Sequence, residues 1–231
     1  MSTRILRSRD NRSGDGGSTV ACVEVFYSLQ SDYCYFLLDR LIGLARKGIE
    51  VIIRPVLGGV LRLPERYQDR DELEQRYFQI DTARTAAYLG LPYAYPDPSP
   101  IQFKPGSLWL PEDEQPLNEY LYRLYVGAVR AGKGLAFLDK AGRMLWDGST
   151  PGWDKGDYLT RAMVAAGLEL DGVLTATPWN KAKTMLAANA LAMINAGHWG
   201  VPLMVYRDEP FYGQDRFDQM IWRMRREREV V

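Results

Sequence analysis

Apolar and polar residues alternate near the start of the chain and then change to a helical repeat. Residues 23–27 ("VEVFY") alternate and are rich in β-branched and aromatic side chains, which predicts a strand. Over residues 33–47 the apolar positions recur at helical spacing until Gly48, which predicts a helix. The largely apolar run 49–56 predicts a second, buried strand. Strand, helix and strand in about thirty residues form a βαβ unit with parallel strands.

The middle of the chain has a different pattern. Helical spacing recurs over residues 72–89, 117–131 and 158–166, and again from about residue 179. No strand-like alternation separates these segments. We therefore expect residues 65–189 to form an inserted all-helical lobe.

The strand pattern returns near the C-terminus. Residues 203–206 and 210–212 predict two short strands joined at "RDE", which is a hairpin signal. Residues 215–225 follow with apolar side chains on one helical face. The order is β-α-β, helical insertion, β-β-α, so residues 22–64 and 190–231 together predict one α/β domain.

Composition and charge narrow the class of protein. Lys plus Arg and Asp plus Glu both number 29, and this zero net charge argues against a general electrostatic hold on nucleic acid. No apolar run approaches the roughly 20 residues of a membrane-spanning helix. Residues 1–21 are rich in Ser, Gly, Arg and Asp and lack the apolar stretch of a secretory signal, which predicts a disordered tail. Cys22 lies at the start of the first strand and Cys34 past its end, so a disulfide between them would strain the backbone. Two thiols that do not form a disulfide indicate a cytoplasmic protein, because the cytosol is reducing.

The stretch "SDYC" lies where the first strand passes into the first helix. At this position Ser31 is either a plain N-cap or a hydrogen-bond donor to an anion bound at the positive end of the helix. Asp32 is an alternative N-cap. Cys34 lacks a second cysteine three residues before it, where Ser31 stands, so it cannot form the local disulfide of a dithiol enzyme. It is either a reactive single thiol or a small, packed apolar residue, and the second is the more frequent case.

Three further features carry weaker signals. The Val201–Pro202 pair enters a strand and is a candidate cis-proline. Gln214 and Asp215 open the last helix, where the backbone N–H groups can bind a carboxylate and the Asp215 side chain can bind an ammonium group. The alternative is that Asp215 only caps the helix. His198 is the sole histidine, which excludes a multi-histidine metal site, and we predict no metal.

A group of aromatic residues gathers near the Pro-rich loop 90–100. These side chains either line an apolar pocket or, as the safer expectation, build the core of the insertion: Tyr88, Tyr93, Tyr95, Phe103 and Trp109.

Taken together, these phrases resemble a known family. "SDYC" after the first strand, "GVP" before the hairpin, "YGQDRFD" at the last helix and the phrase D-x-x-R-x-A-x-x-x-G-L-P at 81–92 look like the thioredoxin-like fold with an inserted helical domain. Within this fold, the sequence resembles the 2-hydroxychromene-2-carboxylate isomerases and the kappa-class glutathione transferases. The bacterial periplasmic disulfide oxidants are more distant relatives.

The resemblance implies a glutathione site. In that family the first Ser of the active loop hydrogen-bonds the thiol of glutathione, which implies this role for Ser31. The cysteinyl unit would lie on the backbone of Val201 and Pro202, and the γ-glutamyl group on Gln214 and Asp215. Tyr33, His198 and Trp199 are secondary candidates beside the pocket: Tyr33 as part of the active loop, the other two from the "GHWG" loop.

Two departures from the family pattern stand out. Glu74 or its neighbours stand where relatives carry a lysine towards glutathione, and "GGVLRLPERYQ" has no counterpart of the Asn-containing stretch that relatives have after the second strand. Within the matching loop, Asp32 replaces the usual Pro and Cys34 the last Ser.

The resulting hypothesis is a glutathione-dependent isomerase of a small aromatic or unsaturated acid, a homodimer like its relatives. The alternatives are a redox protein using Cys34, a kappa-like transferase, and a binding protein without catalysis.

Overall fold

A four-stranded mixed sheet lies at the centre of the molecule in the computed structural model, which describes residues 21–107 and 109–227. The strands are β1 (Cys22–Tyr27), β2 (Glu50–Pro55), β3 (Leu203–Tyr206) and β4 (Glu209–Tyr212), in the order β2-β1-β3-β4. β1 and β2 are parallel, whereas β3 is antiparallel to both β1 and β4. The predicted α/β order is confirmed. The predicted tail lies outside the described residues apart from Ala21.

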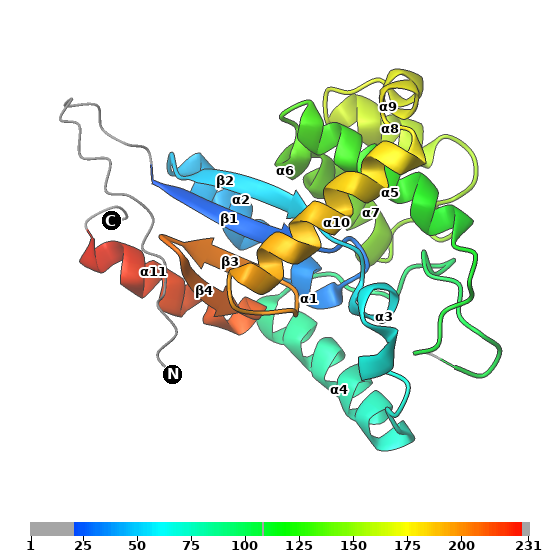
Figure 1. Ribbon diagram of the computed structural model, residues 1–231, viewed down its shortest axis with the longest axis horizontal. Helices are drawn as coiled ribbons and strands as arrows, with labels where there is room; N and C mark the ends of the chain where they lie inside the picture. Colours follow the sequence, from blue (N-terminus) through cyan, green and yellow to red (C-terminus); the bar gives the residue numbers. More distant parts are fainter. Residues whose placement is uncertain (1–20, 108, 228–231) are drawn as a thin grey trace, which may run out of the picture.

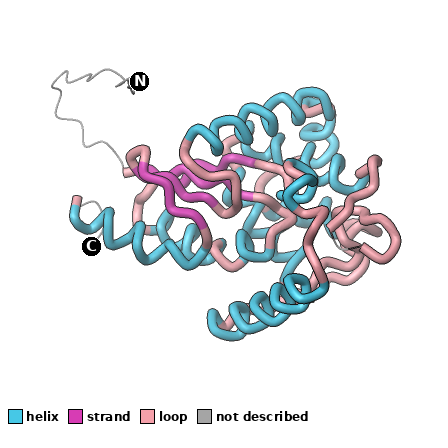
Figure 2. Tube along the Cα trace, turned by 60° about the horizontal axis from the view of Figure 1, so that its bottom comes forward, coloured by secondary structure: helices cyan, strands magenta, loops and turns pink. Residues whose placement is uncertain are grey.

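Helices cover both faces of this sheet (Figures 1 and 2). Neighbouring side chains of a strand point to opposite faces. Val25 belongs to the buried cluster that contains Leu41 of α2 (Leu38–Arg46) and Met220 of α11 (Phe217–Arg226). Phe26, the next residue of β1, packs instead with Met193 of α10 (Trp179–Asn195). The sheet is therefore the middle of three layers.

The helix predicted over residues 33–47 is divided, which corrects the sequence expectation. α1 (Asp32–Tyr35) ends before Phe36, and α2 begins at Leu38. The Leu37 N–H donates to the Cys34 carbonyl three residues back, at 3.1 Å, which tightens the chain at the junction. Phe36 and Leu37 are both buried there, so side chains pack on all sides of the break.

The insertion between β2 and β3 consists of helices and loops. In its described part no strand forms, apart from one isolated bridge between Phe103 and Pro111. Its elements, with a π-helical turn at Leu138–Gly142, are α3 (Gly59–Arg62), the 3₁₀ turn Pro64–Arg66, α4 (Glu72–Leu89), α5 (Pro116–Arg130), α6 (Gly134–Phe137), α7 (Arg143–Trp146), α8 (Tyr158–Ala165), α9 (Leu170–Ala176) and α10. The four long predicted helices are confirmed; the short ones have too few residues to show a helical repeat.

One continuous core joins the insertion to the sheet. The Tyr122 hydroxyl of α5 donates to the Val56 carbonyl at 2.7 Å, and the Asn189 amide of α10 donates to the Pro55 carbonyl at 2.9 Å. α10 runs unbroken across the predicted boundary between residues 189 and 190. These hydrogen bonds fix the insertion to the carboxyl end of β2, beside the carboxyl end of β1, after which the candidate residues begin.

Candidate functional site

Ser31 caps the short helix α1. Its backbone is extended and its Oγ accepts the Cys34 N–H at 3.3 Å, which confirms the cap. A hydroxyl has one donor and two acceptor positions. The remaining hydrogen can turn to the Cys34 sulfur or outward, because Ser31 also lines a cavity. The cap and the donor roles are therefore compatible.

Cys34 is a packed thiol. It is 0% exposed, and its sulfur accepts the Ser28 N–H at 3.4 Å. Burial raises the pKa of the Cys34 thiol to about 12, although the contacts with Ser28 and Ser31 lower it in part. A thiolate is the reactive form of cysteine. At neutral pH Cys34 is therefore protonated, whereas the alternative in which it is the working thiol requires the thiolate.

We expect the two thiols to react very differently with a thiol-specific reagent. Cys22 is exposed and Cys34 is buried, and neither is in a disulfide. One thiol per chain should be labelled within minutes in the native protein and the second only on addition of denaturant. Mass spectrometry of the labelled peptides, with Cys22→Ser as the control, checks this. Rapid native labelling of Cys34 would contradict the packed role.

Asp32 is a buried carboxyl. It is 3% exposed; Oδ1 accepts the Tyr33 N–H at 2.8 Å and Oδ2 the Tyr93 hydroxyl at 3.4 Å. Burial raises the pKa of Asp32 to about 7, and these two hydrogen bonds offset part of that effect. Ser31 provides the cap, so the predicted alternative cap role of Asp32 is wrong.

A cavity of about 220 Å³ opens in front of Ser31 and Asp32. This volume is below the roughly 300–1,000 Å³ of sites for drug-sized ligands, so it suits a small molecule. Its walls come from the "SDYC" turn, from α3 and the turn after it, from the Pro-rich loop and from residues 199–201. The aromatic side chains that line it are Tyr33, Tyr67, Phe78, Tyr95, Phe103, Trp109, Trp146, Trp199 and Tyr212.

The aromatic group predicted near the Pro-rich loop divides between several places. Tyr95, Phe103 and Trp109 line the cavity, and Tyr93 packs against Phe36 with ring centroids 5.1 Å apart. Tyr88 does neither, because it is 87% exposed on α4. The expectation that the group is mainly core is therefore wrong for most of its members, since the loop bends round the cavity mouth instead of entering the lobe.

Two arginines also line the cavity. Arg62 donates from Nε to the Leu57 carbonyl at 2.7 Å and from Nη2 to the Trp199 carbonyl at 3.0 Å. It forms no ion pair with a carboxylate in residues 21–107 or 109–227, and burial lowers its pKa. The Arg70 guanidinium lies 4.7 Å from the ring centroids of both Tyr67 and Trp109. The cavity thus combines aromatic walls with positive charge.

A second, open groove of about 500 Å³ adjoins this cavity. Val201, Gln214 and Asp215 line it, so the structure brings together three predicted site residues from the two sides of the β3–β4 hairpin. Tyr33, Val201 and Tyr212 line both spaces and form the boundary between them. Ser31 lies on the cavity side of that boundary.

The polar groups of the groove differ in how far they are already paired. The Val201 N–H and C=O make no hydrogen bond to any other described residue. The peptide bond from Val201 to Pro202 is cis, as predicted, and the Pro202 carbonyl accepts the Gly213 N–H at 2.9 Å. Pro202 itself is buried and lines neither space.

Gln214 and Asp215 are held by arginines. Arg40 donates to the side-chain carbonyl of Gln214, which leaves the Gln214 amide hydrogens available. The Asp215 carboxylate pairs with Arg216 at 2.7 Å. The last helix opens with a 3₁₀ turn, Gln214–Arg216, instead of regular helix.

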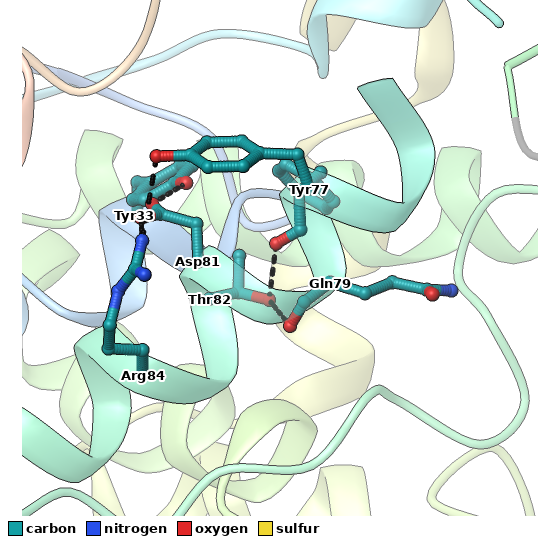
Figure 3. Close-up of polar contacts among 7 residues, drawn as sticks. Tyr33, Tyr77, Gln79, Asp81, Thr82 and Arg84 are labelled. Atoms are coloured by element: carbon teal, nitrogen blue, oxygen red, sulfur yellow. Dashed lines mark hydrogen bonds and ion pairs between the residues drawn. The ribbon is translucent and has the colours of Figure 1, made fainter. Parts of the chain in front are cut away.

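A polar network on α4 orients Tyr33 at the boundary between cavity and groove (Figure 3). The Tyr33 hydroxyl donates to Asp81 Oδ2 at 2.5 Å, and Arg84 pairs with Asp81 Oδ1 at 2.6 Å. The Thr82 hydroxyl donates to backbone carbonyls of its own helix. The D-x-x-R spacing of the sequence therefore places both charges on one helical face, against Tyr33.

His198 and Trp199 have different positions. Trp199 lines the cavity, whereas His198 lines neither space and stacks on Tyr212 at a centroid distance of 3.7 Å. His198 Nδ1 accepts the Gly200 N–H at 2.8 Å, and burial lowers the pKa of the imidazole. His198 thus supports the Tyr212 wall.

Sequence reasoning missed several residues of this site. Arg62, Tyr67, Arg70 and Phe78 line the cavity, yet none lies in a motif that the sequence analysis used for the site. Their only signal is a position shortly after the second strand or on the next helix. Within the described residues, no cluster of His, Cys, Asp and Glu could hold a metal ion, and no helix is long and apolar enough to cross a membrane.

The parallel β1–β2 pair, the antiparallel β3–β4 hairpin and the helices on both faces define a thioredoxin-like fold with a helical insertion. Residues 22–224 match the DSBA-like thioredoxin domain, and the chain belongs to this family. No curated protein matches the sequence at a significant level.

Several solved structures share the fold. A 2-hydroxychromene-2-carboxylate isomerase is 18% identical with a TM-score of 0.65, covering 89% of this chain and 95% of its own. A probable DsbA oxidoreductase from Streptomyces coelicolor is 19% identical with a TM-score of 0.60, covering 91% and 92%. A cytosolic disulfide reductase from Pseudomonas aeruginosa is 13% identical with a TM-score of 0.55, covering 89% and 98%. These likenesses establish the fold and confirm the family resemblance.

Proposed function

We propose that this protein is a glutathione-dependent isomerase of a small aromatic or unsaturated carboxylate. The observation that carries the proposal is that two neighbouring spaces share part of their lining. The cavity at Ser31 shares Tyr33, Val201 and Tyr212 with the groove at Gln214 and Asp215. A thiol peptide in the groove would thus place its sulfur beside a small ligand in the cavity.

The residues of the groove fit glutathione. The unpaired Val201 N–H and C=O suit the peptide backbone of a cysteinyl unit, as in strand addition. The Asp215 carboxylate suits the γ-glutamyl ammonium, and Arg216 and the Gln214 amide suit its carboxylate. Bound glutathione would supply a thiolate nucleophile for reversible addition to an electrophilic carbon.

Ser31 would stabilise the negative charge on that sulfur by donating its free hydroxyl hydrogen. Because α1 has only four residues, fewer aligned peptide dipoles point at the site than the predicted helix 33–47 would provide. The stabilisation therefore depends mainly on the hydroxyl group.

Arg62 and the aromatic walls favour a flat anion in the cavity. The Arg62 guanidinium has no carboxylate partner of its own among the described residues, so a ligand carboxylate would compensate its burial. The predicted homodimer and the predicted cytoplasmic location remain part of this proposal. A kappa-like transferase would bind glutathione in the same groove but conjugate it to another electrophile. Activity assays with a panel of conjugation acceptors would distinguish the transferase from the isomerase.

Calorimetric titration with glutathione tests the proposal. We expect binding at millimolar or lower concentration, weakened about 10- to 100-fold in Asp215→Asn, because a hydrogen bond to a charged group contributes about 1.5–3 kcal/mol. Asp157→Asn, at an exposed carboxylate in another part of the fold, is the matched control. No heat of binding by the wild-type protein at millimolar glutathione would exclude both the isomerase and the transferase.

A further inference from the structure

The carboxyl group of Asp32 has an unusual position for an acidic side chain. Asp32 lines the aromatic cavity next to Ser31, and the residue is only 3% exposed. Among the described residues its two oxygens accept only from neutral donors, namely the Tyr33 N–H, the Tyr93 hydroxyl and its own backbone N–H. No ion pair to Asp32 occurs in the part of the chain that the structure describes. A buried carboxylate without a cation is costly, so this arrangement requires an explanation.

A purely structural explanation is insufficient. Ser31 already caps α1, so the helix does not need Asp32 at its start. Asp32 therefore contributes a carboxyl group to a cavity whose lining also includes aromatic side chains and two arginines.

We propose that Asp32 is an acid–base residue of this site, which gives a proton to the small ligand in the cavity and takes it back. This assignment rests on the proposed isomerase function. Asp32 would donate its carboxyl proton to the ligand oxygen that receives the electron pair of the opened double bond. It would take the proton back when the double bond re-forms, so no proton is consumed in the cycle.

The surroundings keep both forms of Asp32 accessible near neutral pH. Burial raises the pKa of Asp32 to about 7, the nearby Asp81 charge raises it slightly, and the two hydrogen bonds lower it. An acid–base group is most effective when its pKa lies near the working pH. The titratable and charged groups that face it or share its cavity are Tyr33, Cys34, Asp81, Tyr93, Tyr95, Tyr67, Tyr212, Arg62 and Arg70.

A titration without substrate gives the first test. In the protein labelled with carbon-13 at aspartate carboxyls, the signal missing from Asp32→Asn should titrate at about pH 7. Because the folded pKa lies above the unfolded value, the stability due to the protonated carboxyl is complete below about pH 4 and is lost as pH rises through 7. The unfolding midpoint of the wild type should therefore fall relative to Asp32→Asn over this interval. A signal that titrates near pH 4 would overturn the assignment.

The pH profile of isomerisation gives the second test, with 2-hydroxychromene-2-carboxylate as the probe. We expect wild-type kcat to fall above about pH 7, and Asp32→Asn to lose about 100- to 10,000-fold in kcat together with this limb. Tyr93→Phe removes a hydrogen bond that lowers the Asp32 pKa, so it should move the limb to higher pH. Asp157→Asn is the control and should change neither.

Glutathione binding separates the possible failures. Asp32→Asn should bind glutathione within about twofold of the wild type, because the groove residues are unchanged. Intact binding with full kcat and an unchanged limb in Asp32→Asn would overturn the role of Asp32 alone. Absence of glutathione binding by the wild type would overturn the proposed function and this assignment with it.

Discussion

Replacing Ser31 by alanine is expected to lower kcat/KM for glutathione-dependent isomerisation of 2-hydroxychromene-2-carboxylate about 100- to 1,000-fold. Loss of one preorganised donor to a developing anion has an effect of this size in other enzymes. In the proposed function the Ser31 hydroxyl, whose oxygen accepts the Cys34 N–H, would be this donor beside the groove. Without it the pKa of bound glutathione should rise, so ultraviolet absorbance of the bound thiolate at neutral pH should decrease as the rate decreases.

Two variants control this result. Ser31→Thr keeps the hydroxyl and should retain most of the rate. Cys34→Ala, three residues away and without a role in the proposed chemistry, should change kcat/KM by less than about threefold. Ser31→Ala also loses an N-cap worth about 1 kcal/mol, which denaturant unfolding measures separately. An active Ser31→Ala together with an inactive Cys34→Ala would instead favour the redox alternative.

Replacing Arg62 by methionine is expected to weaken binding of the anionic substrate about 10- to 100-fold, seen mainly in KM. A hydrogen bond to a charged group contributes about 1.5–3 kcal/mol, which corresponds to this range. Arg62 lines the cavity, and its donors are only partly used by the Leu57 and Trp199 carbonyls. Methionine keeps the length and apolar stem of the side chain.

A comparison of ligands distinguishes charge recognition from a structural effect. The amide analogue of the substrate carries no charge and should bind Arg62→Met as it binds the wild type. Arg66→Met is the matched control, because Arg66 is exposed, does not line the cavity and has its guanidinium 4.7 Å from the Trp199 ring centroid. Equal weakening of acid and amide by Arg62→Met would show that the variant disturbs the wall and that the anion is recognised elsewhere.

The strands and long helices follow from local patterns in the sequence. β3 begins and ends at the predicted residues, because its apolar side chains follow the period of a strand. Glu209 joins β4 because a two-residue turn at Arg207 and Asp208, both with positive φ, closes the hairpin one residue earlier than predicted. The predicted single helix 33–47 is divided because tertiary packing of Phe36 and Leu37 prevails over a helical period.

The sequence by itself determined the element order, and it offered the cap at Ser31 and the cis peptide bond between Val201 and Pro202 as candidates that the structure confirms. These features depend on neighbours a few residues apart, whose periodicity and hydrogen bonding are local. Only the tertiary structure decided that Cys34 is a packed thiol with a pKa of about 12 and that Asp32 is a buried acid with a pKa of about 7. It also decided that Arg62 faces the same cavity. Burial and the ionisation that follows from it depend on which distant segments cover a side chain, and for Asp32 these include Tyr93 of the insertion.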